Sequence, residues 1–205
     1  MKRLLVFVLA PLLMLAAGCA KAPTEKLAAA EKAVSEAQAA GAPTYMAEDF
    51  AKLEGMLNNA KKEIADQDAK FAFTRDYEKA EQLLTTTQTD AGRVTADTGK
   101  KKEEAKAAAV QAQQAAQEAV KTAQDLVAKA PVGKDRAALE AIKADAQGLA
   151  TSLSEVQAAI DSGDYLGAQA KAKAIQEKSQ AVTSEIQTAM AKVSGAKAKK
   201  GKGGK

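Results

Sequence analysis

The stretch MAEDFAKLEGMLNNAKKEI, residues 46–64, contains the pattern that decides the fold. Its apolar positions alternate strictly between spacings of four and three residues: Met46, Phe50, Leu53, Leu57, Ala60 and Ile64. That spacing places them along one face of an α-helix and is typical of a helix that packs lengthwise against another helix. The stretch therefore predicts a long amphipathic helix.

The same periodicity continues on both sides of this stretch, and no segment alternates as a strand does. Helices are also expected over residues 24–40, with Thr24 as the N-cap, and over residues 100–130, whose larger apolar residues are Val110, Val120, Leu126 and Val127. Three further segments show the spacing, at Tyr77, Ala80, Leu84, Thr87, Ala91 and Val94; at Leu139, Ile142, Ala146, Leu149, Leu153, Val156 and Ile160; and at Tyr165, Ala168, Ala172, Ile175, Ser179, Val182 and Ile186. The predicted fold class is all-α, an antiparallel helical bundle or a set of coiled-coil hairpins.

The chain also repeats itself. Ala33-Val34 matches Ala119-Val120 and Leu53-Glu54 matches Leu139-Glu140 at one constant offset, and Asp76-Tyr77 matches Asp164-Tyr165 after a short insertion. This pattern indicates a duplicated three-helix unit, residues 24–95 and 100–194. Convergence of alanine-rich helices on similar strings is the alternative. Gly92 and Gly99 favour a break between the units, and one helix continuing through residues 95–100 is the other possibility.

The composition narrows the chemistry that this chain can perform. The 205 residues include no His, no Trp and a single Cys, and aromatic residues make up 3%. These counts exclude a Ser-His-Asp triad, a Cys-His pair and a disulfide, and they leave no ordinary zinc site. The carboxylates lie among lysines at helical spacing, which is typical of a solvated helix surface. We therefore expect a protein that is not an enzyme and that has no cofactor and no metal.

The N-terminus has the features of a targeting segment. Lys2 and Arg3 precede an apolar run that is too short to span a bilayer, and the run ends in small residues before Cys19. The residues Leu15, Ala16, Ala17 and Gly18 before that cysteine resemble the lipobox that the lipoprotein signal peptidase recognises, although leucine is commoner than alanine at the position of Ala16. The alternative is an ordinary secretory signal with a chance cysteine.

The resemblance to a lipobox implies cleavage before Cys19 and lipidation of its thiol and amine. Residues 1–18 would be the lipoprotein signal peptide and residues 19–23 the anchor and linker, so the membrane is the first expected partner. Ala20 follows the anchor where aspartate would resemble an inner-membrane retention signal. The resemblance therefore implies the periplasmic face of the outer membrane in a Gram-negative host.

The C-terminal residues 195–205 differ from the rest of the chain. Five lysines stand among Gly and Ala here: Lys197, Lys199, Lys200, Lys202 and Lys205. Removal of Lys2 and Arg3 takes the formal charge from +4 to +2, and removal of these five lysines as well gives −3. We expect a disordered basic tail that contacts peptidoglycan or another anionic envelope polymer; a solubilising tail without a partner is the alternative. Nucleic acid is not an expected partner, because the tail has no aromatic residue to stack on a base.

Two families share parts of this pattern. The lipobox, the alanine-rich heptads and the terminal Lys205 resemble the architecture of the murein lipoprotein, which implies attachment of Lys205 to peptidoglycan, although this chain ends in Gly-Gly-Lys rather than Tyr-Arg-Lys. Residues 24–94 resemble an uncharacterised family of alanine-rich helical lipoproteins, through Ala-x-x-Ala-Val, Ala-Gly-Ala-Pro-x-Tyr and Asp-Tyr-x-x-Ala. That resemblance implies an envelope role and assigns no catalytic residue.

These features lead to two functional hypotheses. The first is a non-enzymatic envelope lipoprotein that acts as a helical spacer or interaction scaffold and that can self-associate through its helices. The second is a periplasmic carrier or chaperone that binds an apolar ligand between helices, in a cavity among Phe50, Phe71, Phe73 and Tyr77. For Tyr77 and Tyr165 themselves, the expected role is to close a helix-packing layer, with the hydroxyl bonded near the start of the helix.

Overall fold

The computed structural model describes residues 20–130 and 136–200. Its elements are α1 (Thr24–Ala40), α2 (Ala42–Tyr45), α3 (Ala47–Asp68), the short 3-10 helix η1 (Ala72–Thr74), α4 (Glu78–Lys129), α5 (Arg136–Asp161) and α6 (Tyr165–Lys200). No strand occurs within these described ranges, so the predicted all-α class is confirmed.

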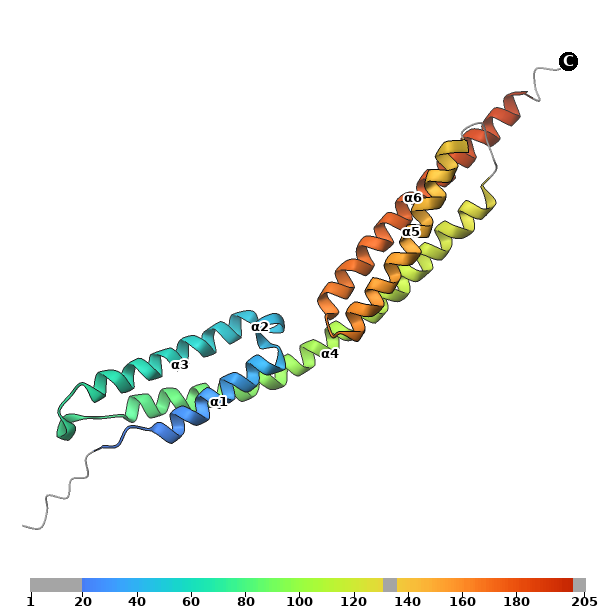
Figure 1. Ribbon diagram of the computed structural model, residues 1–205. Coiled ribbons are helices and arrows are strands. Elements are labelled where there is room, and N and C mark those ends of the chain that lie inside the picture. The colour runs from blue at the N-terminus through green and yellow to red at the C-terminus, as the bar shows by residue number, and fades with distance from the viewer. Residues whose placement is uncertain (1–19, 131–135, 201–205) are drawn as a thin grey trace, which may run out of the picture. The chain divides into compact units, whose positions relative to one another are not determined.

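The contacts divide the chain between Lys100 and Lys101 into two compact units. Unit 1 contains α1, α2, α3 and the first part of α4, whereas unit 2 contains the rest of α4 together with α5 and α6 (Figure 1). In each unit the long helices lie side by side and antiparallel, because the connections between them are short.

The core of unit 1 is formed where the expected apolar faces meet. Ala30, Val34 and Ala37 of α1 pack against α3 and α4. The other buried members of this cluster are Ala42, Phe50, Leu53, Leu57, Ala60, Leu84, Ala91 and Val94. Alanine at many of these positions lets the helix axes approach closely, but each alanine removes little apolar area from water.

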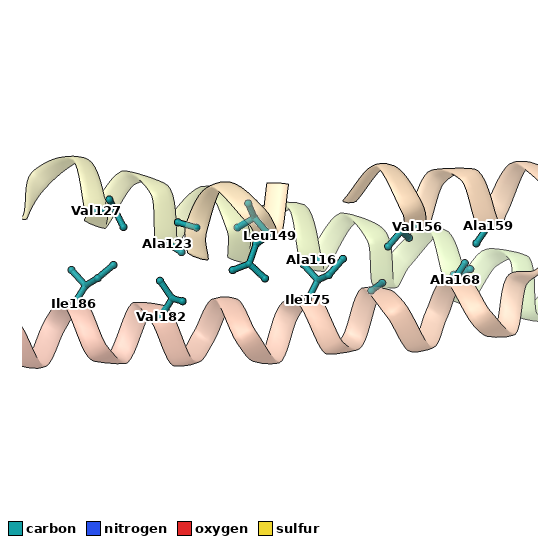
Figure 2. Packing of buried hydrophobic residues seen from close by; sticks show 14 residues of the cluster. Ala116, Ala123, Val127, Leu149, Val156, Ala159, Ala168, Ile175, Val182 and Ile186 are labelled. Atoms are coloured by element: carbon teal, nitrogen blue, oxygen red, sulfur yellow. The ribbon is translucent and has the colours of Figure 1, made fainter. Parts of the chain in front are cut away.

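The core of unit 2 follows the same design. Its buried residues come from all three helices and point toward one another (Figure 2). They are Ala109, Ala116, Val120, Ala123 and Val127 of α4; Ala146, Leu149, Val156 and Ala159 of α5; and Ala168, Ala172, Ile175, Val182 and Ile186 of α6. Val110, one of the larger apolar residues of its segment, is instead 37% exposed, and its neighbour Ala109 is fully buried.

The helix α4 is continuous through both units, so the break expected near Gly92 and Gly99 does not occur. A glycine inside a helix costs about 1 kcal/mol relative to alanine. Val94 and Thr98, which lie between these two glycines in the sequence, are fully buried. We attribute the continuity to this packing and to the strong helix formers that follow Gly99, which together outweigh the preference of the glycines for a break.

Two helix boundaries differ from the sequence-based expectation. Thr24 is the first residue of α1, whose N-cap position is held by Pro23 without a side-chain hydrogen bond, so the assignment of Thr24 as the N-cap is wrong. α6 continues to Lys200 rather than ending near residue 194. Alanine and lysine are strong helix formers, and a single glycine such as Gly195 is tolerated within a helix.

The first part of α4 in unit 1 and α6 in unit 2 bury residues at the same spacing. Ala80, Leu84, Thr87, Ala91, Val94 and Thr98 of α4 are buried, and so are Ala168, Ala172, Ile175, Ser179, Val182 and Ile186 at the same spacing in α6. The aspartates before them have similar roles. Asp76 accepts a bond from the amide of Glu78 at 2.9 Å, and Asp164 accepts one from the amide of Gly167 at 3.0 Å. The two helices thus share the spacing of their buried positions, and the duplication stays a prediction.

Candidate functional site

Most of the residues predicted to anchor the chain and to contact an anionic partner lie outside the described part of the structure. Leu15, Ala16, Ala17, Gly18 and Cys19 lie outside the described residues, as do Lys202 and Lys205. The backbone of Lys197, Lys199 and Lys200 belongs to the end of α6, and their side chains are outside the described part.

The four residues named for a ligand cavity do not line a common one. Phe50 is buried in the core of unit 1 near the start of α3, and Tyr77 is buried at the other end of that helix. Phe71 and Phe73 are 78% and 84% exposed. The predicted cavity among these four residues is therefore not formed.

The connection between α3 and α4 is a turn held by several hydrogen bonds. Arg75 donates from Nη2 to the carbonyl of Asp68 at 2.8 Å and from Nε to the carbonyl of Lys70 at 3.1 Å. These bonds satisfy carbonyls at the C-terminal end of α3 that have no partner inside the helix. Within η1, the Thr74 hydroxyl and amide both donate to the carbonyl of Phe71.

The buried side chain of Gln67 joins α3 to the residues of the turn through hydrogen bonds. Its amide oxygen accepts from Lys70 Nζ and from the backbone amide of Asp76, both at 3.0 Å, and its amide nitrogen donates to Glu63 Oε1 at 3.0 Å. The Tyr77 hydroxyl donates to the carboxylate of Asp68. Tyr77 therefore closes the packing layer at the start of α4, as the sequence predicts.

These contacts shift the pKa values of three side chains, Glu63, Tyr77 and Lys79. The bond from Lys79, and after it the bond from Gln67, lowers the pKa of Glu63 from its usual 4.5, since both favour the charged carboxylate. The same carboxylate raises the pKa of Lys79. The bond to Asp68 raises the pKa of Tyr77, because only the protonated phenol can donate it.

Phe71 and Phe73 project from this turn as a stacked pair. Their ring centroids lie 5.9 Å apart and the ring planes are inclined by 11°. Two large exposed aromatic side chains on a hydrogen-bonded turn are unusual in a chain whose aromatic content is 3%. The sequence signal for this pair is Phe-Ala-Phe in a short connection, outside the apolar spacing of both neighbouring helices.

The remaining surface of the described residues has weaker candidates for a functional site. A shallow depression is lined by Lys26, Glu78, Glu81, Gln82, Thr85 and Thr86, and Lys26 there pairs with Glu81 at 2.5 Å. In the described part of the chain, no cluster of acidic, Cys or His residues is suited to a metal ion. None of the helices in residues 20–130 and 136–200 combines the length and apolar character needed to cross a bilayer.

Comparison with family models, with curated proteins and with solved structures gives no match for this chain.

Proposed function

We propose that this chain is a non-enzymatic cell-envelope lipoprotein. Lipid on Cys19 anchors it to the periplasmic face of the outer membrane of a Gram-negative host, and its helical units act as a spacer or interaction scaffold. The observation that supports this proposal most strongly is the lipobox-like run from Leu15 to Gly18 directly before the single cysteine of the chain.

The packing of the helical units supports a scaffold rather than a carrier. Apart from Phe50, both core clusters consist of small and branched side chains. The aromatic residues named for a ligand cavity do not lie together, since Phe50 and Tyr77 are buried at opposite ends of α3 and Phe71 and Phe73 are exposed. We propose the outer helix faces and the chain ends as the surfaces for partners, including a second copy of the chain.

Lipidation can be tested by expressing the chain and its Cys19→Ser variant in a Gram-negative host that is fed an alkyne-labelled fatty acid. We expect the wild-type chain to incorporate the label and to sediment with the outer membrane, and the variant to do neither. Equal labelling of the two chains, or recovery of the wild-type chain without label in the soluble periplasm, would refute the anchor.

The second part of the proposal concerns the basic tail. The five lysines of residues 197–205 account for the net positive charge of the mature chain, so we propose that they contact peptidoglycan or another anionic envelope polymer. Joint replacement of Lys197, Lys199, Lys200, Lys202 and Lys205 by glutamine should weaken sedimentation with purified peptidoglycan at least about tenfold at low salt. Replacement of the same lysines by arginine is the matched control and should preserve it.

A covalent link through Lys205 is a separate form of this contact. Muropeptides from purified wall would then include fragments joined to the C-terminal lysine, and deletion of Lys205 would abolish them. Binding that survives this deletion but fails after the glutamine replacement indicates a purely electrostatic contact.

A further inference from the structure

The start of α1 and the turn between α3 and α4 lie at the same end of unit 1. Lys26, in the first turn of α1, pairs with Glu81, in the first turn of α4, with Nζ and Oε2 2.5 Å apart. Lys61 of α3 pairs with Glu31 of α1 at 2.7 Å, in agreement with antiparallel helices. Figure 1 shows η1 at the end of unit 1 from which α1 begins.

This geometry places the aromatic pair close to the proposed lipid anchor. Cys19 precedes Thr24 by five residues, and an extended chain spans at most about 3.6 Å per residue, so the anchor lies within about 18 Å of the start of α1. The opposite end of unit 1, at Gly41–Tyr45, lies about 26 Å from the start of α1, the length of this 17-residue helix, and is therefore beyond the reach of the five-residue tether. Phe71 and Phe73 are therefore on the membrane-proximal end of the unit.

We propose that the stacked pair Phe71–Phe73 inserts into the interfacial region of the phospholipid leaflet that holds the anchor. The inference rests on the proposed function for the position of the membrane. An aromatic wedge of this size binds lipid weakly by itself, but an anchor in the same surface raises its effective concentration there. The contact gives unit 1 a second attachment point and orients it with η1 toward the bilayer.

The charges of the turn indicate whether anionic lipid head groups contribute to the binding of the aromatic pair. Lys70 and Arg75 flank the pair, but the carboxylates of Asp68 and Asp76 lie in the same turn. Two N–H donors of Arg75, on Nε and Nη2, are engaged with backbone carbonyls. Apolar insertion rather than attraction to anionic head groups is therefore the driving force, and we expect little dependence on the fraction of anionic lipid or on salt.

The composition of the chain permits a direct test. It has no tryptophan and one cysteine, so Phe73→Trp introduces a single tryptophan that can be excited selectively over the tyrosines, and Cys19 is the single site for conjugation. The mature chain, residues 19–205, is coupled through Cys19 to a maleimide-bearing phospholipid in phosphatidylcholine vesicles. Tryptophan emission and its quenching by brominated lipids are then measured.

We expect the Phe73→Trp chain to show a blue-shifted emission and quenching several-fold stronger than in a matched Thr44→Trp chain. Thr44 is exposed in α2, at the opposite end of the same unit. Addition of Phe71→Ser to the Phe73→Trp chain should reduce the quenching, and circular dichroism verifies that each variant folds.

Solvent-like emission from Phe73→Trp, with quenching equal to that of Thr44→Trp, would overturn the inference. So would concentration-dependent oligomers of the unconjugated chain that Phe71→Ser with Phe73→Ser abolishes, since the pair would then bind a second copy. Conjugation replaces cellular lipidation in this experiment. Failure of the insertion is therefore distinguishable from failure of the proposed function, which is detected as absence of fatty acid on Cys19 in cells.

Discussion

Thr87 and Thr98 stand in α4 where unit 2 has Ile175 and Ile186, and all four side chains are buried. The two hydroxyls differ in their partners. Thr87 Oγ1 donates to the carbonyl of Leu83 at 2.8 Å, whereas Thr98 Oγ1 has no hydrogen-bond partner within the described part of the chain. A buried hydroxyl without a partner lowers stability by about 1 to 3 kcal/mol relative to one that is satisfied. At the position of Thr98, unit 1 therefore carries a polar defect where unit 2 has the apolar Ile186.

The first prediction follows from this defect. Thr98→Val removes the hydroxyl while nearly keeping the shape of the side chain, so we expect the free energy of unfolding to rise by about 1 kcal/mol. Urea denaturation followed by circular dichroism measures the change. Thr87→Val is the matched control and should bring a smaller gain, because it also removes a satisfied bond. Destabilisation by Thr98→Val would show that its hydroxyl is bonded in solution.

The second prediction concerns the pair of Glu63 and Lys79, whose Oε2 and Nζ atoms are 2.6 Å apart. The lowered pKa of Glu63 contributes stability above its unfolded value of 4.5, and this stability is lost as the pH falls through the folded pKa. The raised pKa of Lys79 contributes below 10.5 and is lost as the pH rises through its folded value. Glu63→Gln should thus lower the melting temperature at neutral pH and have a smaller effect at pH 3. An equal effect at both pH values would contradict this assignment.

At the scale of the elements, the apolar spacing of the sequence predicts most of the helix faces. Every position of the seam from Tyr77 to Val94 is buried, because a helix with such spacing has one face that can exclude water. Spacing does not predict which neighbour takes a buried place in an alanine-rich helix, and so Ala109 rather than Val110 is in the core. It also does not predict the continuity of α4, which depends on packing around the glycines.

The glycines of the chain provide the third prediction. A Cβ added at Gly99 meets no atom within 4 Å, so Gly99→Ala should stabilise the continuous helix by about 0.5 to 1 kcal/mol. The contrasting change is Gly41→Ala. Gly41 ends α1 with a φ of 101°, a conformation that alanine adopts only with strain, and we expect a loss of about 1 kcal/mol. Urea denaturation of both variants measures these changes, and destabilisation by Gly99→Ala would contradict a continuous α4.

The candidate site shows a clear limit of sequence-based prediction. Phe71 and Phe73 are recognisable as apolar residues in a short connection, and this type of residue ordinarily indicates a buried contact or a ligand cavity. Their exposure depends on how Arg75 and Gln67 order the turn through bonds to its backbone. Such hydrogen bonds are not indicated by any periodic pattern in the sequence and are identified only from the three-dimensional structure.

At the scale of the whole molecule, the chain combines two helical units with chemically distinct ends. The N-terminal end has the proposed lipid anchor, with an exposed aromatic pair on the same end of unit 1, and the C-terminal end has clustered lysines. Between them, the described residues form two hydrophobic cores. This distribution favours roles in attachment and spacing, and it makes the chain ends the decisive places for experiments.

The fourth prediction concerns the relative importance of those ends. Cys19→Ser should release the chain from the outer membrane without changing its circular dichroism or melting temperature, because the cysteine precedes the first helix. Replacement of the five tail lysines by glutamine should leave membrane attachment intact and reduce only the contact with the anionic polymer. Membrane fractionation and sedimentation with purified peptidoglycan separate the two effects. Release from the membrane by the lysine replacement would contradict this division of roles.

The most direct test of the central claim is the mass of the N-terminal tryptic peptide from the chain extracted out of the outer membrane. Cleavage after Lys21 yields the short peptide Cys19-Ala20-Lys21. The proposed function predicts that this peptide begins at Cys19 and has the added mass of a thioether-linked diacylglycerol and an amide-linked acyl chain. A peptide with unmodified Cys19, or an N-terminus produced by cleavage at another residue, would contradict it.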